Sequence, residues 1–176
     1  DVVLMVLAGF VNKELVAALE SEGVRAAGLC GADGATFSAG KISLAKTPLD
    51  KIQGHAVDLG YVGRVQTADS TLVVALLAAG FMPVIATTAP LAHGAVDPAD
   101  HFYNINADLA AGPLARAFGA DALLFLTDVP GVLGVDRACI ERLTPAHSRE
   151  LRQGGVIQGG MIPKVDAALE ERFGEV

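Results

Sequence analysis

Two apolar runs, each preceded by a stretch of helical periodicity, constrain the fold of this chain most strongly. Met82–Ala89 and Ala122–Val129 are almost continuous in apolar residues, and they follow the helical patterns Leu72–Ala79 and Leu109–Phe118. Strands that are apolar on both faces are typical of parallel sheets covered by helices on both sides. The sequence therefore predicts an α/β fold with an open, mostly parallel sheet sandwiched by helices.

Shorter patterns around these runs predict further helices, strands and turns. Apolar residues at helical spacing run from Leu4 to Leu19, and Gly23 follows as a helix terminator. Asp69 or Ser70 is placed to cap the helix that begins at Leu72. The remaining expected elements are a strand over 24–30, a turn over 31–35, a strand or hairpin arm over 36–43, a weak strand within 57–66, a helix from Pro145 to Gln153 and a last helix that begins near Pro163.

Composition and charge exclude several classes of protein. Hydrophobic residues make up 52% of the 176-residue chain and charged residues 19%, so a packed core is expected in one domain or in two small lobes. The net charge of −7 argues against a surface that wraps nucleic acid or lies on anionic lipid. The longest apolar run, Leu72–Ala86, is too short for a membrane helix and is interrupted by Gly80 and Pro83. We expect neither nucleic acid nor a membrane as a partner.

The cysteines and the first residue of the chain add two expectations. Cys30 and Cys139 have no second Cys or His at metal-finger spacing, which suits a reducing compartment and indicates a cytoplasmic protein. The chain opens at Asp1 inside a helical pattern, without an initiator Met. We therefore expect a piece of a longer protein.

Two stretches imitate functional motifs only weakly. Ala35–Ile42 ("ATFSAGKI") nearly matches a phosphate-binding P-loop, but Ala35 replaces the first glycine and Ile42 replaces the Ser or Thr that would hold magnesium. A second group of possible metal ligands consists of His93, Asp97, Asp100 and His101. These four residues follow no recognised ligand spacing, and a solvated loop is the simpler interpretation. No metal site is predicted.

A glycine-rich stretch before the last expected helix is more informative. Gly154–Lys164 ("GGVIQGGMIPK") contains four glycines, which let a backbone approach a ligand closely, and it places Lys164 in the first turn of a helix. The helix dipole disfavours a cation at that end, so the lysine suggests an anionic ligand. A flexible loop with a surface lysine remains the alternative.

Three polar side chains lie at alternate positions just before another expected helix. Asn104, Asn106 and Asp108 occur in "YNINAD", and in an extended segment they point to one side. Capping the helix needs only one of them. The other two suit a polar ligand, with the Asn amides binding it and Asp108 orienting a cation such as Lys164. A plain polar turn is the alternative.

Five motifs together resemble one family. "AGFVNKELV", "DLGYVGRV", "YNINADLAAG", "LLFLTDVPGVL" and "GGVIQGGMIPKVDAAL" occur in the order and approximate spacing of the acetylglutamate kinases, within the amino-acid-kinase superfamily. The resemblance covers almost the whole chain. It implies an acceptor-binding lobe, of which residues 1–117 are the remainder, and a nucleotide-binding lobe, of which 118–176 are a part. It also implies ATP-dependent phosphorylation of the side-chain carboxylate of N-acetyl-L-glutamate in arginine biosynthesis, with ATP and Mg²⁺ as cofactors.

The resemblance further implies roles for individual residues. Asn104 and Asn106 are expected to bind the acceptor, Asp108 to hold the catalytic lysines in place, and Lys164 to neutralise charge on the transferring phosphoryl group. The segments expected to line the ATP site contain Asp128, Val129, Pro130, Gly131, Val132, Leu133, Val156, Ile157 and Gln158. Phosphoryl transfer depends on positioning and charge neutralisation, which fits these residue types. A homodimer or higher homo-oligomer is also implied.

Some motifs of the family are not present in this chain. The resemblance implies that the chain is incomplete at both ends, with a short segment expected after Val176. The amino-terminal Lys-x-Gly-Gly strand, the glycine-rich acceptor loop and an acceptor-binding arginine are expected before Asp1, so the chain alone is expected to be inactive. Two alternatives stay open. One is a kinase of lysine biosynthesis for carrier-protein-linked aminoadipate or glutamate, although those enzymes tend to have Asp at the position of Asn106. The other is a non-catalytic nucleotide-binding module.

Overall fold

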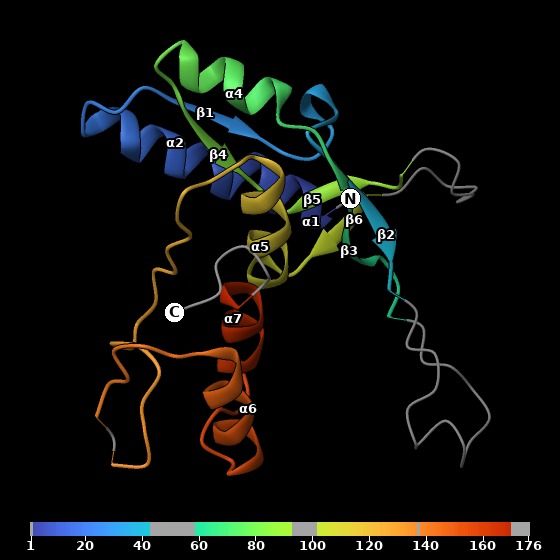
Figure 1. Cartoon of the computed structure of the whole chain (residues 1–176). Helices are drawn as coiled ribbons and strands as arrows, with labels where there is room; N and C mark the ends of the chain where they lie inside the picture. The colour runs from blue at the N-terminus through green and yellow to red at the C-terminus, as the bar shows by residue number, and fades with distance from the viewer. Residues whose placement is uncertain (1, 43–58, 93–101, 137, 170–176) are drawn as a thin grey trace, which may run out of the picture. The chain divides into compact units, whose positions relative to one another are not determined.

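A computed structural model of the chain describes residues 2–42, 59–92, 102–136 and 138–169, and Figure 1 shows its helices and strands. The backbone forms two compact units, Asp1–Asn106 and Ala107–Val176. The first unit contains α1 (Val2–Leu4), η1 (Met5–Val11), α2 (Asn12–Ser21), β1 (Ala26–Leu29), η2 (Asp33–Ala35), β2 (Phe37–Lys41), β3 (Val62–Ala68), α4 (Thr71–Ala78), β4 (Met82–Ile85), β5 (Thr88–Pro90) and β6 (Phe102–Ile105). The second contains α5 (Ala107–Ala117), α6 (Pro145–Gln153) and α7 (Met161–Ala168).

The first unit begins with one long apolar helix made of α1, the π-helical η1 and α2. Within the described part of the chain, this helix, Val2–Ser21, is the one that is long and apolar enough to cross a membrane, with 20 residues and a mean hydropathy of 1.9. Only 6% of the most apolar 18-residue stretch of this helix is buried. Because the core helix of a soluble protein passes the same test of length and composition, the test alone assigns no membrane.

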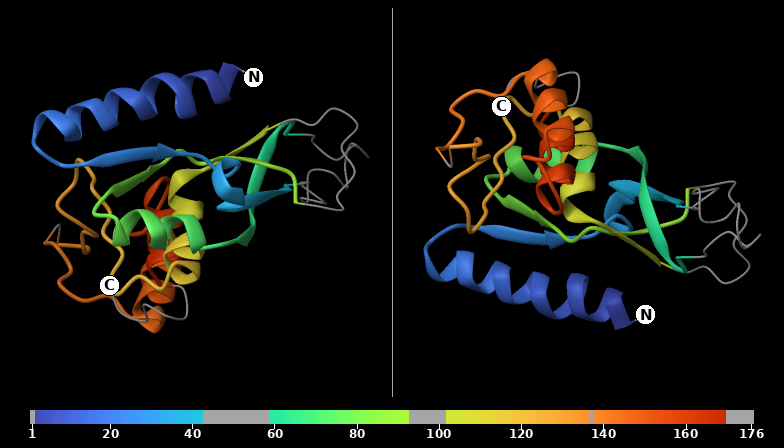
Figure 2. Two further views of the ribbon diagram at one scale, coloured as in Figure 1. Left: turned by 90° about the horizontal axis from the view of Figure 1, so that it is seen from above. Right: turned by 90° about the horizontal axis from the view of Figure 1, so that it is seen from below.

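Side chains of α2 attach this helix to a two-stranded sheet. β1 and β4 pair in parallel, from Ala26 opposite Met82 to Leu29 opposite Ile85, and Figure 2 shows the helix running beside β1. Asn12 donates to the carbonyl of Val84 at 2.9 Å, and Lys13 donates to the carbonyl of Gly28 at 3.1 Å. The two hydrogen bonds connect the helix to both strands.

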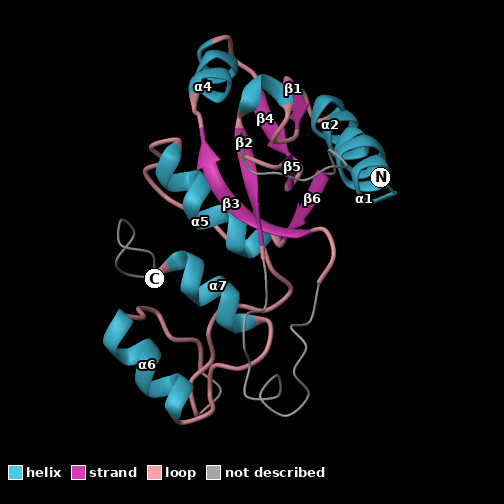
Figure 3. Ribbon diagram, turned by 90° about the vertical axis from the view of Figure 1, so that its right-hand side faces the viewer, coloured by secondary structure: helices cyan, strands magenta, loops and turns pink. Residues whose placement is uncertain are grey.

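The second sheet of this unit contains most of its buried side chains. Its strand order is β2-β3-β6-β5, and Figure 3 shows these strands in magenta. The pair β3–β6 is parallel, and the pairs β2–β3 and β5–β6 are antiparallel. Fully buried residues on these strands include Phe37, Ala39, Ala89, Tyr103 and Ile105. A Cβ built on Gly63 would lie 3.0 Å from the Cβ of Tyr103 and 3.2 Å from that of Ala39, so these three residues face the same side of the sheet.

The second unit has a helical core. Leu143, Ile157 and Val165 are buried together, with Ile140, Leu151, Met161 and other partly buried residues packed around them. Thr144 precedes α6, and its hydroxyl accepts a hydrogen bond from the backbone N–H of His147 at 3.2 Å. Arg152 of α6 forms an ion pair with Asp166 of α7. The core and the ion pair connect α6 to α7.

Among the described residues, four helices end with the same hydrogen bonds around a glycine. At each end the glycine N–H bonds the carbonyl three residues back, and the next N–H bonds the carbonyl five residues back. The glycines are Gly23, Gly80, Gly119 and Gly155, with φ between 69° and 82°. A glycine adopts this left-handed conformation without the steric cost of a Cβ. The predicted role of Gly23 as a helix terminator is confirmed.

Most predicted elements are found close to their predicted bounds. The α/β class, the first helix, the strand within 24–30, the strand within 36–43 and the helix from Pro145 to Gln153 are confirmed. Of the two candidate caps before α4, Asp69 accepts a hydrogen bond from the N–H of Thr71 at 2.7 Å, while the Ser70 side chain makes no capping bond. Cys30 and Cys139 are both free thiols.

The predicted strands after α4 and α5 need correction. Met82–Ala89 is not one strand: β4 pairs with β1 and β5 pairs with β6, so the run divides between two sheets. Ala122–Val129 forms no strand in the described structure, and its backbone is irregular. A strand requires a hydrogen-bonded neighbour, and the described residues supply none there. The share of parallel pairing is also smaller than expected, because β2 and β5 join their sheet antiparallel.

Candidate functional site

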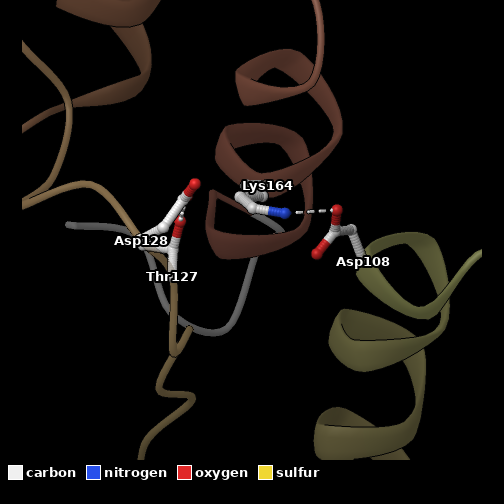
Figure 4. Close-up of polar contacts among 4 residues, drawn as sticks. All are labelled: Asp108, Thr127, Asp128 and Lys164. Carbon is white, nitrogen blue, oxygen red and sulfur yellow. Dashed lines mark hydrogen bonds and ion pairs between the residues drawn. The ribbon is translucent and has the colours of Figure 1, made fainter.

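A charged pair connects two helices of the second unit. The amine of Lys164, on α7, donates to a carboxylate oxygen of Asp108, on α5, at 2.6 Å. The side chains are 28% and 24% exposed, so both are mostly shielded from water. Figure 4 shows the lysine amine pointing toward Asp108. The sequence proposed this pairing from residues 56 positions apart, and the structure brings them into contact.

Local sequence explains why the two side chains can meet. Asp108 lies in the first turn of α5, where the helix dipole favours a carboxylate. α7 begins at Met161, two residues before the predicted start, and follows Gly159, whose φ is 54°. Val165, next to Lys164, is buried in the core. The buried neighbour holds the helix, and Lys164 extends from its partly exposed side.

A cavity of about 630 Å³ lies next to this pair within the second unit. One wall is formed by residues 121–127 and 129–132, and the other by α7. Lys164 lines the cavity together with Met161, Val165 and Ala168 of the same helix. The lysine therefore connects two features, because its side chain borders the cavity and its amine bonds Asp108.

The predicted nucleotide residues divide into two groups. Val129, Pro130, Gly131 and Val132 line the cavity. Asp128 lies beside them in the chain, is exposed, and accepts a hydrogen bond from the hydroxyl of Thr127 at 3.2 Å. In Figure 4 Thr127 and Asp128 lie on the other side of Lys164 from Asp108.

The remaining predicted nucleotide residues lie outside the lining of the cavity. Leu133 forms an isolated bridge with Cys139. Ile157 is 3% exposed and belongs to the helical core, and the N–H of Val156 closes the end of α6 on Leu151. Gln158 donates to the carbonyl of Gly155. Their described contacts are structural, and their predicted contact with a nucleotide stays a prediction.

Sequence reasoning missed several residues that line the cavity. Met161, Val165 and Ala168 were not singled out, although with Lys164 they recur at intervals of three and four. That spacing is the signature of one helix face, so it was available in the sequence. The sequence predicts a buried strand over Ala122–Val129, and that interpretation hides the contribution of these residues to the cavity wall.

The two predicted acceptor residues belong to the first unit. Asn104 lies on β6, half-buried, opposite Val62 of β3 and Thr88 of β5. Asn106 is exposed and immediately precedes α5. The polar pattern of the sequence therefore spans the boundary between the two units. The roles of both residues stay predictions.

The two weak motifs do not gain support. Phe37–Lys41, within the P-loop-like stretch, is strand β2, and β3 pairs along it. His93, Asp97, Asp100 and His101 lie outside the described residues. Within the described ranges, no group of three or more His, Cys, Asp or Glu side chains is placed to hold a metal ion.

Comparison with known proteins identifies the family of this chain. The model of the amino acid kinase family matches residues 1–171. Acetylglutamate kinase of Methanopyrus kandleri is 48% identical over 96% of this chain and 65% of its own length. Acetylglutamate kinase of Brucella anthropi is 46% identical over 97% of the chain and 55% of its own length. The chain thus spans roughly 55–65% of the length of these relatives.

Solved structures agree with the family match. The crystal structure of smu.665 from Streptococcus mutans UA159 has a TM-score of 0.72 at 29% identity, and covers 93% of this chain and 59% of that chain. N-acetylglutamate synthase from Neisseria gonorrhoeae, complexed with coenzyme A and L-arginine, has a TM-score of 0.60 at 18% identity, over 90% of this chain and 36% of its own, and supports the fold alone. The sequence motifs, the fold and these matches lead to one conclusion: the chain belongs to the amino acid kinase family.

Proposed function

We propose that the full-length protein containing this chain uses ATP to phosphorylate the side-chain carboxylate of N-acetyl-L-glutamate. The observation that carries the proposal is the Lys164–Asp108 pair at the wall of the cavity. The names of the relatives supply the substrate class, because the chain is 45–48% identical to proteins named acetylglutamate kinase. On this basis the reaction is a step of arginine biosynthesis.

Lys164 is the residue that we assign to the transferring phosphoryl group. Phosphoryl transfer spreads negative charge over three oxygens, and a fixed cation stabilises that charge most where water is excluded. At 28% exposure the lysine side chain is largely shielded, and it borders a cavity of about 630 Å³, within the size range of small-molecule sites. Asp108 holds the amine in place through their charge-assisted hydrogen bond.

The cavity is the proposed site of the nucleotide. Val129, Pro130, Gly131 and Val132 supply backbone and apolar surface to its wall, which suits the flat faces of a base and a sugar. Mg²⁺ would arrive with the phosphates and neutralise part of their charge. Because no three-ligand group occurs among the described residues, we assign it no protein ligand.

The acceptor is assigned to Asn104, supported by Asn106. N-acetyl-L-glutamate carries two carboxylates and an acetyl carbonyl, all of which accept hydrogen bonds, and an Asn carboxamide has two N–H donors for them. Asn at position 106 favours free acetylglutamate over the carrier-protein-linked acceptors of lysine biosynthesis. A cytoplasmic homo-oligomer, with no nucleic acid or membrane as partner, completes the proposal.

A hydroxamate assay on the full-length protein tests the proposal. An acyl phosphate formed from ATP and N-acetyl-L-glutamate is trapped by hydroxylamine, and we expect a rate far above that with glutamate or aspartate. Equal rates with unacetylated glutamate would contradict the acceptor assignment. Activity only with a carrier-protein-linked substrate would identify the lysine-biosynthesis alternative, and ATP binding without turnover would identify a binding module.

A further inference from the structure

Thr88 carries a buried hydroxyl that the proposed function does not use. Its side chain is on β5, and the residue is 1% exposed. Within the part of the chain that the structure describes, its Oγ1 is one of two buried side-chain polar atoms without a hydrogen-bond partner. A buried hydroxyl without a partner is costly, so such an atom needs an explanation.

The sheet register places Thr88 directly beside Asn104. The two residues are opposite each other in the antiparallel pair β5–β6, and opposite residues of neighbouring strands project from the same face of a sheet. The backbone N–H of Asn104 donates to the carbonyl of Tyr61, the residue before β3, whereas the N–H of Ile105 donates to the carbonyl of Thr87. Thr88 and Asn104 are therefore a non-hydrogen-bonded pair, the kind in which side chains approach most closely.

The chemistry of the two side chains is complementary. A threonine hydroxyl has one donor and two acceptor positions. An Asn carboxamide has a carbonyl oxygen that accepts and an amino group that donates, and a flip of the amide exchanges their places. An Asn that binds carboxylates must present its amino group to the ligand. A hydroxyl beside it that donates to the amide oxygen selects this orientation over the flipped one.

We propose that Thr88 is a positioning residue of the acceptor site, whose hydroxyl donates to the carboxamide oxygen of Asn104 when the acceptor is bound. Thr88 acts through Asn104, because its own oxygen is buried. The inference rests on the proposed function, since it assumes that Asn104 binds the acceptor.

The chain offers matched variants for a test. Thr88→Val removes the hydroxyl and keeps the shape, and Thr88→Ser keeps the hydroxyl and removes a methyl group. Thr87→Val is the control, because the adjacent residue has the same side-chain chemistry but precedes β5 and is not the residue paired with Asn104. All are made in the full-length enzyme and assayed by hydroxamate formation, with a melting curve for each.

We expect Thr88→Val to raise the KM for N-acetyl-L-glutamate by about 3- to 10-fold, the range for one neutral hydrogen bond. The kcat and the KM for ATP should stay within about twofold of wild type, and the melting temperature should not fall, since an unpartnered hydroxyl is replaced by a methyl group. Thr88→Ser should keep the wild-type KM even where its melting temperature falls. Thr87→Val should leave the acceptor KM unchanged.

A double-mutant cycle separates action through Asn104 from an independent effect. Asn104→Ala alone should raise the acceptor KM and spare that for ATP, and Thr88→Val should then add nothing to it. An unchanged acceptor KM in Thr88→Val, a Thr88→Ser that behaves like Thr88→Val, or full additivity with Asn104→Ala would each overturn the inference. A wild-type protein that forms no acyl phosphate would overturn the proposed function itself. The wild-type assay alone gives that result, so the two failures are distinguishable.

Discussion

The segments that follow α4 and α5 begin alike and end differently. Both helices close on a left-handed glycine, Gly80 or Gly119, with the same pair of backbone hydrogen bonds. After Gly80 the chain enters a ladder at once, with the N–H of Met82 on Arg25 and that of Ala86 on Leu29, each at 2.8 Å. After Gly119 no described strand pairs with residues 122–129, and Leu124 and Leu126 are 83% and 97% exposed.

This difference shows that an apolar segment forms a strand only beside another strand. Apolar composition and a proper helix end are present in both segments, but only the first has a neighbour that accepts and donates backbone hydrogen bonds. The first segment therefore contributes a strand to each of two sheets, β4 to one and β5 to the other, and β5 places Thr88 beside Asn104. The second becomes a wall of the cavity that Lys164 borders. We expect substitutions at the shared helix ends to affect stability equally, and substitution of Lys164 at the cavity to affect catalysis.

The largest expected effect is at the cavity. In the full-length enzyme, Lys164→Ala should lower kcat by at least about 100-fold, as for the loss of one strong electrostatic donor, with a smaller change in substrate binding. Stability should fall by about 1 kcal/mol or less, because a partly exposed ion pair contributes little. Lys164→Arg keeps the charge on a larger planar group and should restore only part of the rate. Wild-type kcat in a folded Lys164→Ala protein would reject the mechanism.

The two glycines should respond equally, because the two segments share their helix ends. Gly80→Ala and Gly119→Ala should each lower the free energy of unfolding by about 1–2 kcal/mol in urea titrations, the cost of a left-handed backbone with a Cβ. A Cβ at Gly119 meets nothing within 4 Å, and one at Gly80 meets only the Arg25 side chain at 3.8 Å, so crowding adds little.

Gly9 provides the control for these glycine variants. It lies in helix η1, a Cβ there also meets nothing within 4 Å, and it is not among the glycines with positive φ. Gly9→Ala should therefore raise stability. A neutral Gly119→Ala beside a destabilising Gly80→Ala would show that the shared helix end is not maintained after α5.

A smaller, pH-dependent effect is expected at the start of α4. The hydrogen bonds from the Thr71 side chain and backbone lower the pKa of the exposed Asp69 carboxyl below its usual 3.8. A lowered folded-state pKa gives stability that is present above the unfolded pKa and is lost as pH falls through the folded value. The melting temperature of Asp69→Ala should therefore fall slightly below that of wild type at neutral pH, and the difference should shrink below about pH 4. A difference that does not change with pH would contradict this role of the carboxylate.

The smallest effect on the free energy of unfolding is expected in the segment after α5. Leu126→Ser should change the free energy of unfolding by no more than about 0.5 kcal/mol, because the side chain is 97% exposed. Leu143→Ala, at a residue that is 1% exposed in the core of the same unit, should cost about 2–5 kcal/mol. A large loss with Leu126→Ser in the full-length protein would mean that this segment is buried there, as in a true strand.

The sequence by itself determined the features that depend on near neighbours in the chain. Thr144 and Pro145 predict the start of α6, and Gly23 predicts the end of α2, because caps and left-handed turns act over a few residues. The motif order also predicted the family that the comparisons confirm. The Asp108–Lys164 contact could also be predicted from the sequence, because each residue lies at the start of an expected helix and the two side chains carry opposite charges.

Only the tertiary structure decided which segments pair and which face each side chain takes. The division of Met82–Ala89 between two sheets, the missing partner of Ala122–Val129 and the burial of Ile157 depend on residues distant in sequence. The same holds for Thr88, which is an ordinary polar residue in the sequence and becomes a buried, unpartnered hydroxyl beside Asn104 through strand register. Backbone hydrogen bonds between strands and the packing of a core join distant segments, and the local pattern of a single sequence does not specify them.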